Sequence, residues 1–381
     1  MLLSSGIEIF ILKFQFIKIN FVCSESKKLQ PMSTFSRRNF IKTSVLGGIA
    51  ASGISSLYAF TSSPEPIQKE ASVALTTGDN RADLAFRALE PFAKEIKHAI
   101  GNRRVVLKPN NVLTNVPLTS THVDTLEGVL EFLKSINKLN NVIIAESAAN
   151  GPTFDGFDNY GYFRLMNKYP VKLVDLDQQP YDLLHVFDEK DFKPHAMRMS
   201  SILLNPDSYI VSVARMKTHD RVIATLSLKN IVFGAPIKDA GFSWTSQRKP
   251  GAKSDKAIGH GSGFRAINFN LYSLAKQLHP HLALIDGFEG MEGNGPNSGT
   301  PVDHRVCVAS TNWLAADRVA IELMGIDFAK VGYLNFCTQT GMGIGDLTKI
   351  EIIGETIANH IKQYKLNDNI DKQLVWMNPV A

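Results

Sequence analysis

Residues 105–111 read Val-Val-Leu-Lys-Pro-Asn-Asn, so a short apolar run passes directly into a lysine, a proline and two asparagines. An uninterrupted apolar run is typical of a strand buried on both faces, as the strands of parallel sheets are. Six further runs predict strands on the same grounds: Val142–Ala145, Leu173–Asp175, Tyr209–Ala214, Leu282–Ile285, Val306–Ala309 and Ile350–Ile353.

Stretches with helical periodicity separate several of these strands. They are Arg81–Ile100, Val123–Ile136, Gly263–Leu278 and Leu314–Met324. Alternating strands and helices predict an α/β fold, with a mainly parallel sheet and helices on both of its faces. We expect a single domain that carries one long irregular loop, Gly234–Ser262, which is either a flap over an active site or a disordered segment.

The chain divides into five expected segments. Met32 would start an export signal of normal length, so we interpret residues 1–31 as a misannotated upstream extension. Residues 32–60 form a signal peptide, and 61–72 form a linker that contains Thr-Ser-Ser-Pro-Glu-Pro. The α/β domain is expected over 73–365, followed by a C-terminal tail, 366–381.

The signal peptide has the twin-arginine pattern. Arg37 and Arg38 are followed by Phe40 and Lys42, and then by a weakly apolar stretch rich in Gly, Ala and Ser. The expected partner is therefore the twin-arginine translocase, and the expected location is the periplasm or another extracytoplasmic compartment. Membrane contact is expected only through this segment, which is either cleaved near Ala59 or retained as an anchor.

The formal net charge of +5 belongs to the N-terminal segments. Residues 1–59 carry seven Lys or Arg and two Asp or Glu, which leaves 34 residues of each sign beyond position 59. A neutral domain does not attract nucleic acid over its whole surface, so no nucleic-acid partner is expected. Beyond Cys23, Cys307 and Cys337 form no CxxC pair, and they are either disulfide-bonded or two isolated buried thiols.

Reactive side chains follow the predicted strands at their carboxyl ends. Lys108 and Asn110 follow the first strand, and Glu146 follows the second. Lys217 and His219 follow the Tyr209–Ala214 run. Ligands of open α/β sheets bind outside the carboxyl ends of the strands, so we expect these side chains to meet at one rim. Taken singly, each has a plainer interpretation as a surface lysine, a loop cap or a structural histidine.

A second group of polar residues lies further along the chain. Lys229 and Asn230 come from the run Thr225–Asn230, and Lys238 follows it. Together with Lys217 these lysines predict a basic pocket for an anionic small molecule, or else three solvated lysines around a mobile loop. The expected ligand-binding residues are Lys108, Asn110, Lys229, Asn230 and Lys238.

Expected chemical roles follow from residue type. His219 or Glu146 is the expected general base, with Lys217 as a catalytic charge stabiliser. A divalent metal is the expected cofactor if there is one, with His260, Asp286 and Glu292 as its ligands. The glycine-rich stretch 287–301 has the spacing of neither GxGxxG nor GxxxxGK[ST], so we read it as a turn without a nucleotide motif.

Several of these strings occur together in one known family. The matching pieces are Lys108-Pro109-Asn110, Thr121, Lys217-Thr218-His219, Thr225–Asn230, His260, Asp286, Glu292–Pro296 and Asp317. In this combination the chain, over roughly Arg103 to Gly325, resembles the prokaryotic domain of unknown function number 362. The resemblance implies a single α/β domain and assigns no reaction. Some relatives carry a ferredoxin-like iron–sulfur module, but this chain lacks its cysteines, so no iron–sulfur cluster is expected.

Two functions are therefore expected. The first is an exported enzyme that acts on an anionic small molecule at the carboxyl rim of the sheet, with or without a metal ion. The second is a non-catalytic binding protein that captures a small anion or cofactor outside the cytoplasm.

Overall fold

The structure of the protein is a computed structural model that describes residues 69–245 and 247–378. Its strands are β1 (Ala71–Thr77), β2 (Arg104–Pro109), β3 (Val142–Glu146), β4 (Val171–Asp175), β5 (Tyr181–Phe187), β6 (Pro194–Ser200), β7 (Ser208–His219), β8 (Ile223–Thr225), β9 (Leu282–Asn294), β10 (Ser298–Ser310) and β11 (Ile350–Gly354). Its α-helices are α2 (Arg81–Leu89), α3 (Ala93–Ile100), α4 (Val123–Ser135), α5 (Thr153–Asn159), α6 (Phe163–Lys168), α7 (Ser201–Leu204), α8 (Ser227–Val232), α9 (Asp255–Gly261), α10 (Phe264–Ala275), α11 (Trp313–Leu323), α12 (Gly332–Gln339) and α13 (Ile370–Gln373).

One large sheet organises the molecule, with strand order β11-β1-β10-β9-β7-β2-β3-β4 and β8 paired to β7. The pairs β9–β7, β7–β2, β2–β3, β3–β4 and β1–β11 are parallel. The β10 strand runs antiparallel to both of its neighbours. Strands β5 and β6 form a separate antiparallel pair. The predicted α/β class with a mainly parallel sheet is confirmed.

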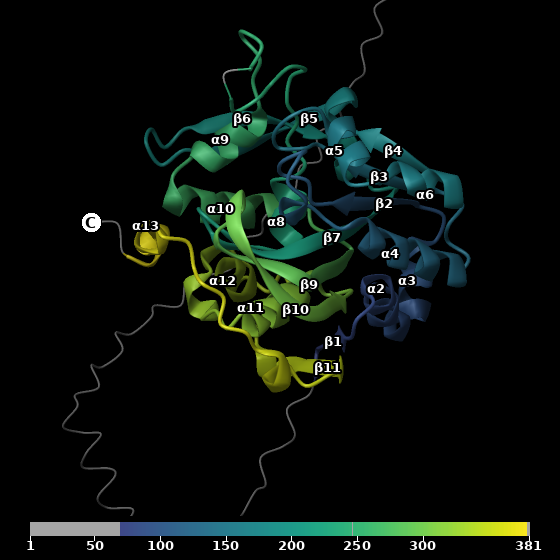
Figure 1. Ribbon diagram of the computed structural model, residues 1–381. Coiled ribbons are helices and arrows are strands. Elements are labelled where there is room, and N and C mark those ends of the chain that lie inside the picture. The colour runs from purple at the N-terminus through teal and green to yellow at the C-terminus, as the bar shows by residue number, and fades with distance from the viewer. Residues whose placement is uncertain (1–68, 246, 379–381) are drawn as a thin grey trace, which may run out of the picture. The chain divides into compact units, whose positions relative to one another are not determined.

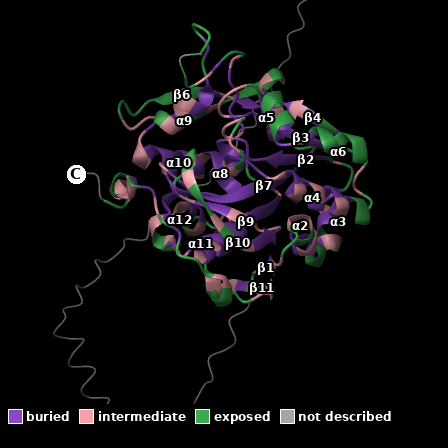
Figure 2. Cartoon of the chain, viewed as in Figure 1, coloured by how far each residue is buried: buried purple, intermediate pink, exposed green. Residues whose placement is uncertain are grey.

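Helices cover both faces of the sheet (Figure 1). On β2, Val105 and Leu107 pack into the core shared with α2, α3 and α4. Val106 points the other way, into the core shared with α8, α10, α11 and α12. Burial on both faces explains why this strand is apolar without interruption. Figure 2 shows the result, a buried sheet with exposure concentrated on the outer helices and loops.

Two predicted elements differ in the structure. The predicted helix Arg81–Ile100 divides into α2 and α3, because Pro91 lacks the N–H that a continuous helix needs and a 3-10 turn forms around it. The predicted turn over 287–301 is largely the β9–β10 hairpin. Its glycines permit close packing: a β-carbon at Gly290 would collide with the Tyr364 hydroxyl.

Structured elements also extend beyond the predicted domain limits. The β1 strand begins at Ala71, inside the predicted linker. In the predicted tail, buried Gln373 accepts a 2.6 Å hydrogen bond from the Ile223 N–H. The predicted irregular loop Gly234–Ser262 contains α9. Residues 1–31, the signal segment 32–60 with Arg37 and Arg38, and residues 61–68 lie outside the described residues.

Two further findings concern the cysteines and the membrane. Cys307 and Cys337 are buried free thiols, and they belong to the cores on opposite faces of the sheet. Of the two alternatives for this pair, isolated thiols are therefore correct. Within residues 69–245 and 247–378, no helix has the length and hydrophobicity needed to span a membrane.

Candidate functional site

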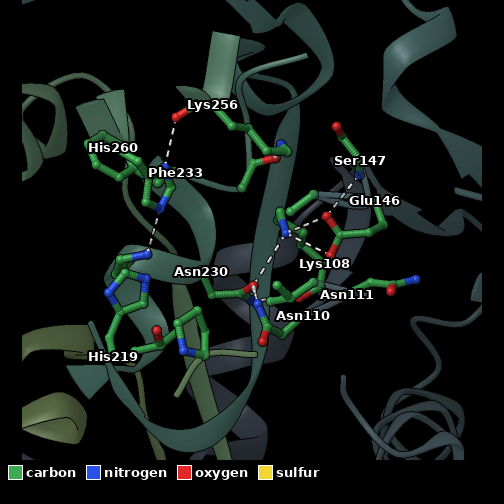
Figure 3. Close-up of a pocket in the computed structure, with 16 residues that line it drawn as sticks. Lys108, Asn110, Asn111, Glu146, Ser147, His219, Asn230, Phe233, Lys256 and His260 are labelled. Carbon is green, nitrogen blue, oxygen red and sulfur yellow. Dashed lines mark hydrogen bonds and ion pairs between the residues drawn. The ribbon is translucent and has the colours of Figure 1, made fainter. Parts of the chain in front are cut away.

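A pocket lies at the carboxyl ends of β2, β3 and β7, against α8 and α9, with a free volume of about 70 Å³. The sheet brings these ends together because the three strands are parallel neighbours. The side chains that carry its chemistry are Lys108, Glu146, His219, Lys229, Lys256 and His260. Figure 3 labels all of them except Lys229.

A buried ion pair forms one wall of the pocket. The Lys108 Nζ lies 2.9 Å from each Glu146 carboxylate oxygen, and the two side chains are only 1% and 2% exposed. The Ser147 N–H donates to the same carboxylate over 2.8 Å. Burial lowers the pKa of Lys108 and raises the pKa of Glu146, while their mutual attraction opposes both changes. Each charge therefore depends on the other.

Asn230 joins α8 to this pair. Its Oδ1 accepts hydrogen bonds from the Lys108 Nζ (3.3 Å) and the Asn110 Nδ2 (3.2 Å). Its Nδ2 donates to the Lys108 carbonyl and to the Ser212 hydroxyl, both over 3.1 Å. The Asn110 Oδ1 is buried at the pocket without a hydrogen-bond partner among the described residues. That oxygen can accept a hydrogen bond from a ligand.

The start of α8 is held from another helix. The Asp317 carboxylate, on α11, accepts the Ser227 N–H (2.8 Å) and the Leu228 N–H (3.1 Å). A carboxylate at this end satisfies amides that the helix itself leaves without partners. Burial raises the pKa of Asp317 to about 7. The interaction fixes the helix that presents Lys229 and Asn230.

The hydrogen bonds of His260 and His219 fix the tautomers of both rings. The His260 Nδ1 lies 2.8 Å from the Lys256 carbonyl and must donate to it, so the Nε2 accepts from the Lys229 Nζ at 3.2 Å. The Arg221 N–H donates to the His219 Nδ1 over 3.0 Å, which favours the neutral tautomer with its hydrogen on Nε2; the Asp220 carboxylate lies 3.1 Å from the same Nδ1. The rings stack with centroids 5.7 Å apart.

Burial makes the groups around these rings favour their neutral forms. Burial, and after it the charge of Lys229, lowers the pKa of His260 to about 3. The pKa of His219 is also well below its ordinary value, for the same two reasons. Burial lowers the pKa values of Lys229 and Lys256 to about 7. At neutral pH both imidazoles are uncharged and both amines are close to their titration midpoints.

Two predicted lysines do not line the pocket. Lys217 lies beneath it, fully buried, and donates to the Thr119 carbonyl over 2.8 Å. Burial lowers its pKa well below the ordinary value. Lys238 forms an ion pair with Asp177 and borders a different cavity. The structure therefore does not assemble the basic pocket from Lys217, Lys229 and Lys238 together.

The three predicted metal ligands have separate surroundings. Asp286 accepts from the Thr125 hydroxyl (2.7 Å) and lies 3.7 Å from Arg81, while Glu292 accepts the Lys365 N–H (2.9 Å). Because β9 continues past Asp286, the backbones of Asp286 and Glu292 lie six strand positions apart, about 20 Å in an extended strand. His260 faces the pocket instead. In the described part of the chain, no group of three or more His, Cys, Asp or Glu side chains is placed to hold a metal ion.

The sequence reasoning missed two residues that shape the pocket. Phe233 packs its ring 5.1 Å from His260 and 5.7 Å from the Lys229 Nζ. Phe233 follows Lys229 by four residues, and side chains four apart on a helix are neighbours, so this spacing could have placed Phe233 beside Lys229. Lys256 donates to the carbonyls of Gly234 (2.8 Å) and Pro236. It lies in the segment predicted as irregular, where no pattern indicated it.

Comparison with known proteins gives a similar curated protein, a similar solved structure and a matching family. The chain is 24% identical over 245 residues to the Thylakoid-associated protein sll1697 of Synechocystis sp., covering 64% of this chain and 70% of that protein. A crystal structure of a protein from Thermotoga maritima aligns with a TM-score of 0.38 at 12% identity, over 65% of this chain and 60% of that one. The family described as "Domain of unknown function (DUF362)" matches residues 105–322, more than half of the chain. The chain belongs to that family.

Proposed function

We propose that the pocket binds a small anionic molecule and that the protein is an exported enzyme acting on it by acid–base chemistry. The observation that carries the proposal is an excess of buried amino groups over carboxylates. Three amino groups, on Lys108, Lys229 and Lys256, border the pocket with a single carboxylate, Glu146. Within the described residues, Lys229 and Lys256 have no ion-pair partner at all. An anion would supply the missing negative charge.

The hydrogen-bond pattern suggests how the acid–base roles divide. The His219 Nε2 carries a hydrogen and can donate it to the ligand. The His260 Nε2 accepts from the Lys229 Nζ and is the side of that ring that can take up a proton. Both Glu146 oxygens are held by Lys108, which favours a role for Glu146 in positioning over one as a free base. In its protonated form Lys229 stabilises negative charge on the ligand, whereas burial disfavours the charge of Lys217, which contacts the Thr119 carbonyl and does not line the pocket.

One experiment separates this proposal from a pocket of purely structural lysines. Titration calorimetry with phosphate, sulfate, oxalate and glycolate should detect binding at one site per chain. Lys229→Ala should weaken that binding at least about tenfold, the loss of one charge-assisted hydrogen bond. Lys172→Ala is the matched control, because it removes an exposed lysine of β4 away from the pocket. If no anion binds, or if both variants bind equally, the proposal fails.

The second candidate is a binding protein without turnover. The complete pairing of Glu146 with Lys108 favours it, because no unengaged carboxylate at the pocket is left to act as a base. Tight stoichiometric binding with no change in any ligand over long incubation would support capture. Release of a chemically altered ligand would support the enzyme.

Export and a metal ion are further parts of the proposal, each with its own test. Arg37→Lys with Arg38→Lys should retain the protein in the cytoplasm, if the twin-arginine translocase carries it. A divalent metal would draw its nitrogen ligands from His219 and His260. Elemental analysis of protein from the exporting compartment, beside the His219→Ala/His260→Ala variant, tests that part directly.

A further inference from the structure

We propose that Lys229 is an amine nucleophile that forms an imine with a small substrate carrying both a carboxylate and a carbonyl group. The inference rests on the proposed anion-binding function and names its substrate class, the small 2-oxo carboxylates. It assigns to one lysine a covalent role that the other lysines at the pocket do not share.

Among the five buried lysines of the described residues, Lys238 borders another cavity, and the hydrogen-bond partners of the other four distinguish Lys229 from the rest. Lys108 is held by a carboxylate, and Lys217 and Lys256 donate to backbone carbonyls. Carboxylate and carbonyl oxygens stabilise an ammonium group and do not remove its proton at neutral pH. Lys229 instead meets the imidazole nitrogen of His260 at 3.2 Å. Of the four, Lys229 is therefore the one whose described partner is an uncharged base.

The state of His260 is set by its second hydrogen bond. Its Nδ1–H is committed to the Lys256 carbonyl, so the lone pair of the Nε2 faces Lys229. The positive charge of Lys229 is among the causes that hold the pKa of His260 down, after burial. When Lys229 gives up its proton, that cause disappears and the ring becomes a better base. Burial also lowers the pKa of Lys229 to about 7, so much of it is the free amine at neutral pH.

The pocket can hold the rest of such a substrate. Lys256 in its protonated form can pair with the carboxylate, and the His219 Nε2–H can bond the carbonyl oxygen. Phe233 closes the wall beside the Lys229 amine. A free volume of about 70 Å³ has room for roughly five water-sized groups, which suits glyoxylate or pyruvate rather than a large metabolite.

The covalent step balances without an oxidant or a reductant. The Lys229 nitrogen attacks the carbonyl carbon and forms a C–N bond, while the π pair of the carbonyl moves to its oxygen. His260 takes a proton from the nitrogen and passes it to that oxygen, which gives a carbinolamine. The nitrogen lone pair then forms the C=N bond, and the C–O bond breaks. The departing hydroxyl takes a second proton from solvent and leaves as water, and the nitrogen keeps its last hydrogen in a protonated imine.

Reductive trapping tests the inference on the native chain. The protein is incubated with glyoxylate or pyruvate and sodium cyanoborohydride, its intact mass is measured, and the modified lysine is located by peptide mapping. We expect one reduced adduct per chain, located on Lys229, and none on Lys229→Arg. His260→Gln, which keeps Lys229, should slow trapping at pH 7. At high pH the free amine forms without a base, so the trapping rates of this variant and the parent should become similar.

Each outcome decides between the ideas. An adduct confined to Lys256, Lys108 or exposed lysines overturns the assignment. Glycolate and lactate lack the carbonyl, so their binding by calorimetry without any trapped 2-oxo acid would keep the anion pocket and remove the imine. If neither the hydroxy acids nor the 2-oxo acids bind or react, the proposed function falls together with the inference.

Discussion

Removal of Lys108 should give the protein a pH dependence of stability that the parent protein lacks. In Lys108→Met a side chain of similar length and no charge replaces the ammonium group. Glu146, 2% exposed, is then left buried without its counter-charge. A buried carboxylate in that position binds a proton rather than remain ionised. The variant therefore holds Glu146 neutral in the folded state, whereas in the unfolded chain it ionises normally.

The size of the effect follows from that proton. Keeping a carboxyl group with an unfolded-state pKa of about 4.3 protonated at pH 7 costs about 4 kcal/mol, at about 1.4 kcal/mol per pH unit. This agrees with the roughly 3–5 kcal/mol observed when one partner of a buried pair is removed. The folded state binds the extra proton, so the loss should shrink to about 2 kcal/mol at a pH of roughly 5.5.

Urea unfolding followed by circular dichroism at several pH values measures these differences. Glu146→Gln provides the mirror image, because Lys108 must then lose its proton, and that variant should recover at high pH instead. The double variant Lys108→Met/Glu146→Gln has no buried charge to compensate and should be more stable than either single variant. A loss below about 1 kcal/mol for Lys108→Met, or a loss that does not change with pH, would refute the idea of a charged buried pair.

Three other substitutions test the surroundings of the pocket. Gly234→Ala should lower the free energy of unfolding by about 1–3 kcal/mol and weaken anion binding, because its β-carbon would collide with the Lys108 side chain. Gly261→Ala is the control: its β-carbon meets no atom within 4 Å, so the free energy of unfolding measured in urea should change by less than about 1 kcal/mol. Since burial lowers the pKa of His260 from 6.5 to about 3, the unfolded chain binds the extra proton between those values. Stability should therefore fall with acidification by up to about 1.4 kcal/mol per pH unit, and His260→Gln should flatten the urea midpoints over this range. Asp317→Asn removes one of the two oxygens that hold the start of α8. We expect the free energy of unfolding to fall by about 1–2 kcal/mol and anion affinity, measured by calorimetry, to weaken. An unchanged affinity would contradict the role given to this helix end.

The sequence predicted the part of the site that depends on sheet topology. Lys108, Glu146 and His219 follow apolar runs, and parallel neighbours bring such positions to one edge whatever the details of packing. The same rule failed for Asp286 and Glu292, because β9 does not end at Asp286 but continues into a hairpin. The glycines of 287–301 suggested a turn in the sequence, but in the β9–β10 hairpin they permit close packing. The sequence alone does not distinguish a turn glycine from a packing glycine.

Other features depended on tertiary contacts that no local pattern contains. Lys256 reaches the pocket because α9 packs against β6, and a lone lysine in a polar stretch gives no sign of that. Lys217 has the right position in sequence, yet its side chain turns beneath the pocket to the Thr119 carbonyl. The β5–β6 pair was missed because β5 is largely exposed and β6 alternates buried methionines with polar or exposed residues, so neither has the uninterrupted apolar run of the central strands.

The four hydrogen bonds of Asn230 limit what this position can become. Its amide uses two donors and two acceptor contacts at once, to groups on β2, the loop after it and β7. Aspartate has the same shape and no donors, glutamine has the donors and an extra methylene, and serine cannot reach both strands. In a saturation library selected for folded, ligand-binding protein, we therefore expect asparagine alone at this position, while exposed positions on the outer helices accept many residues.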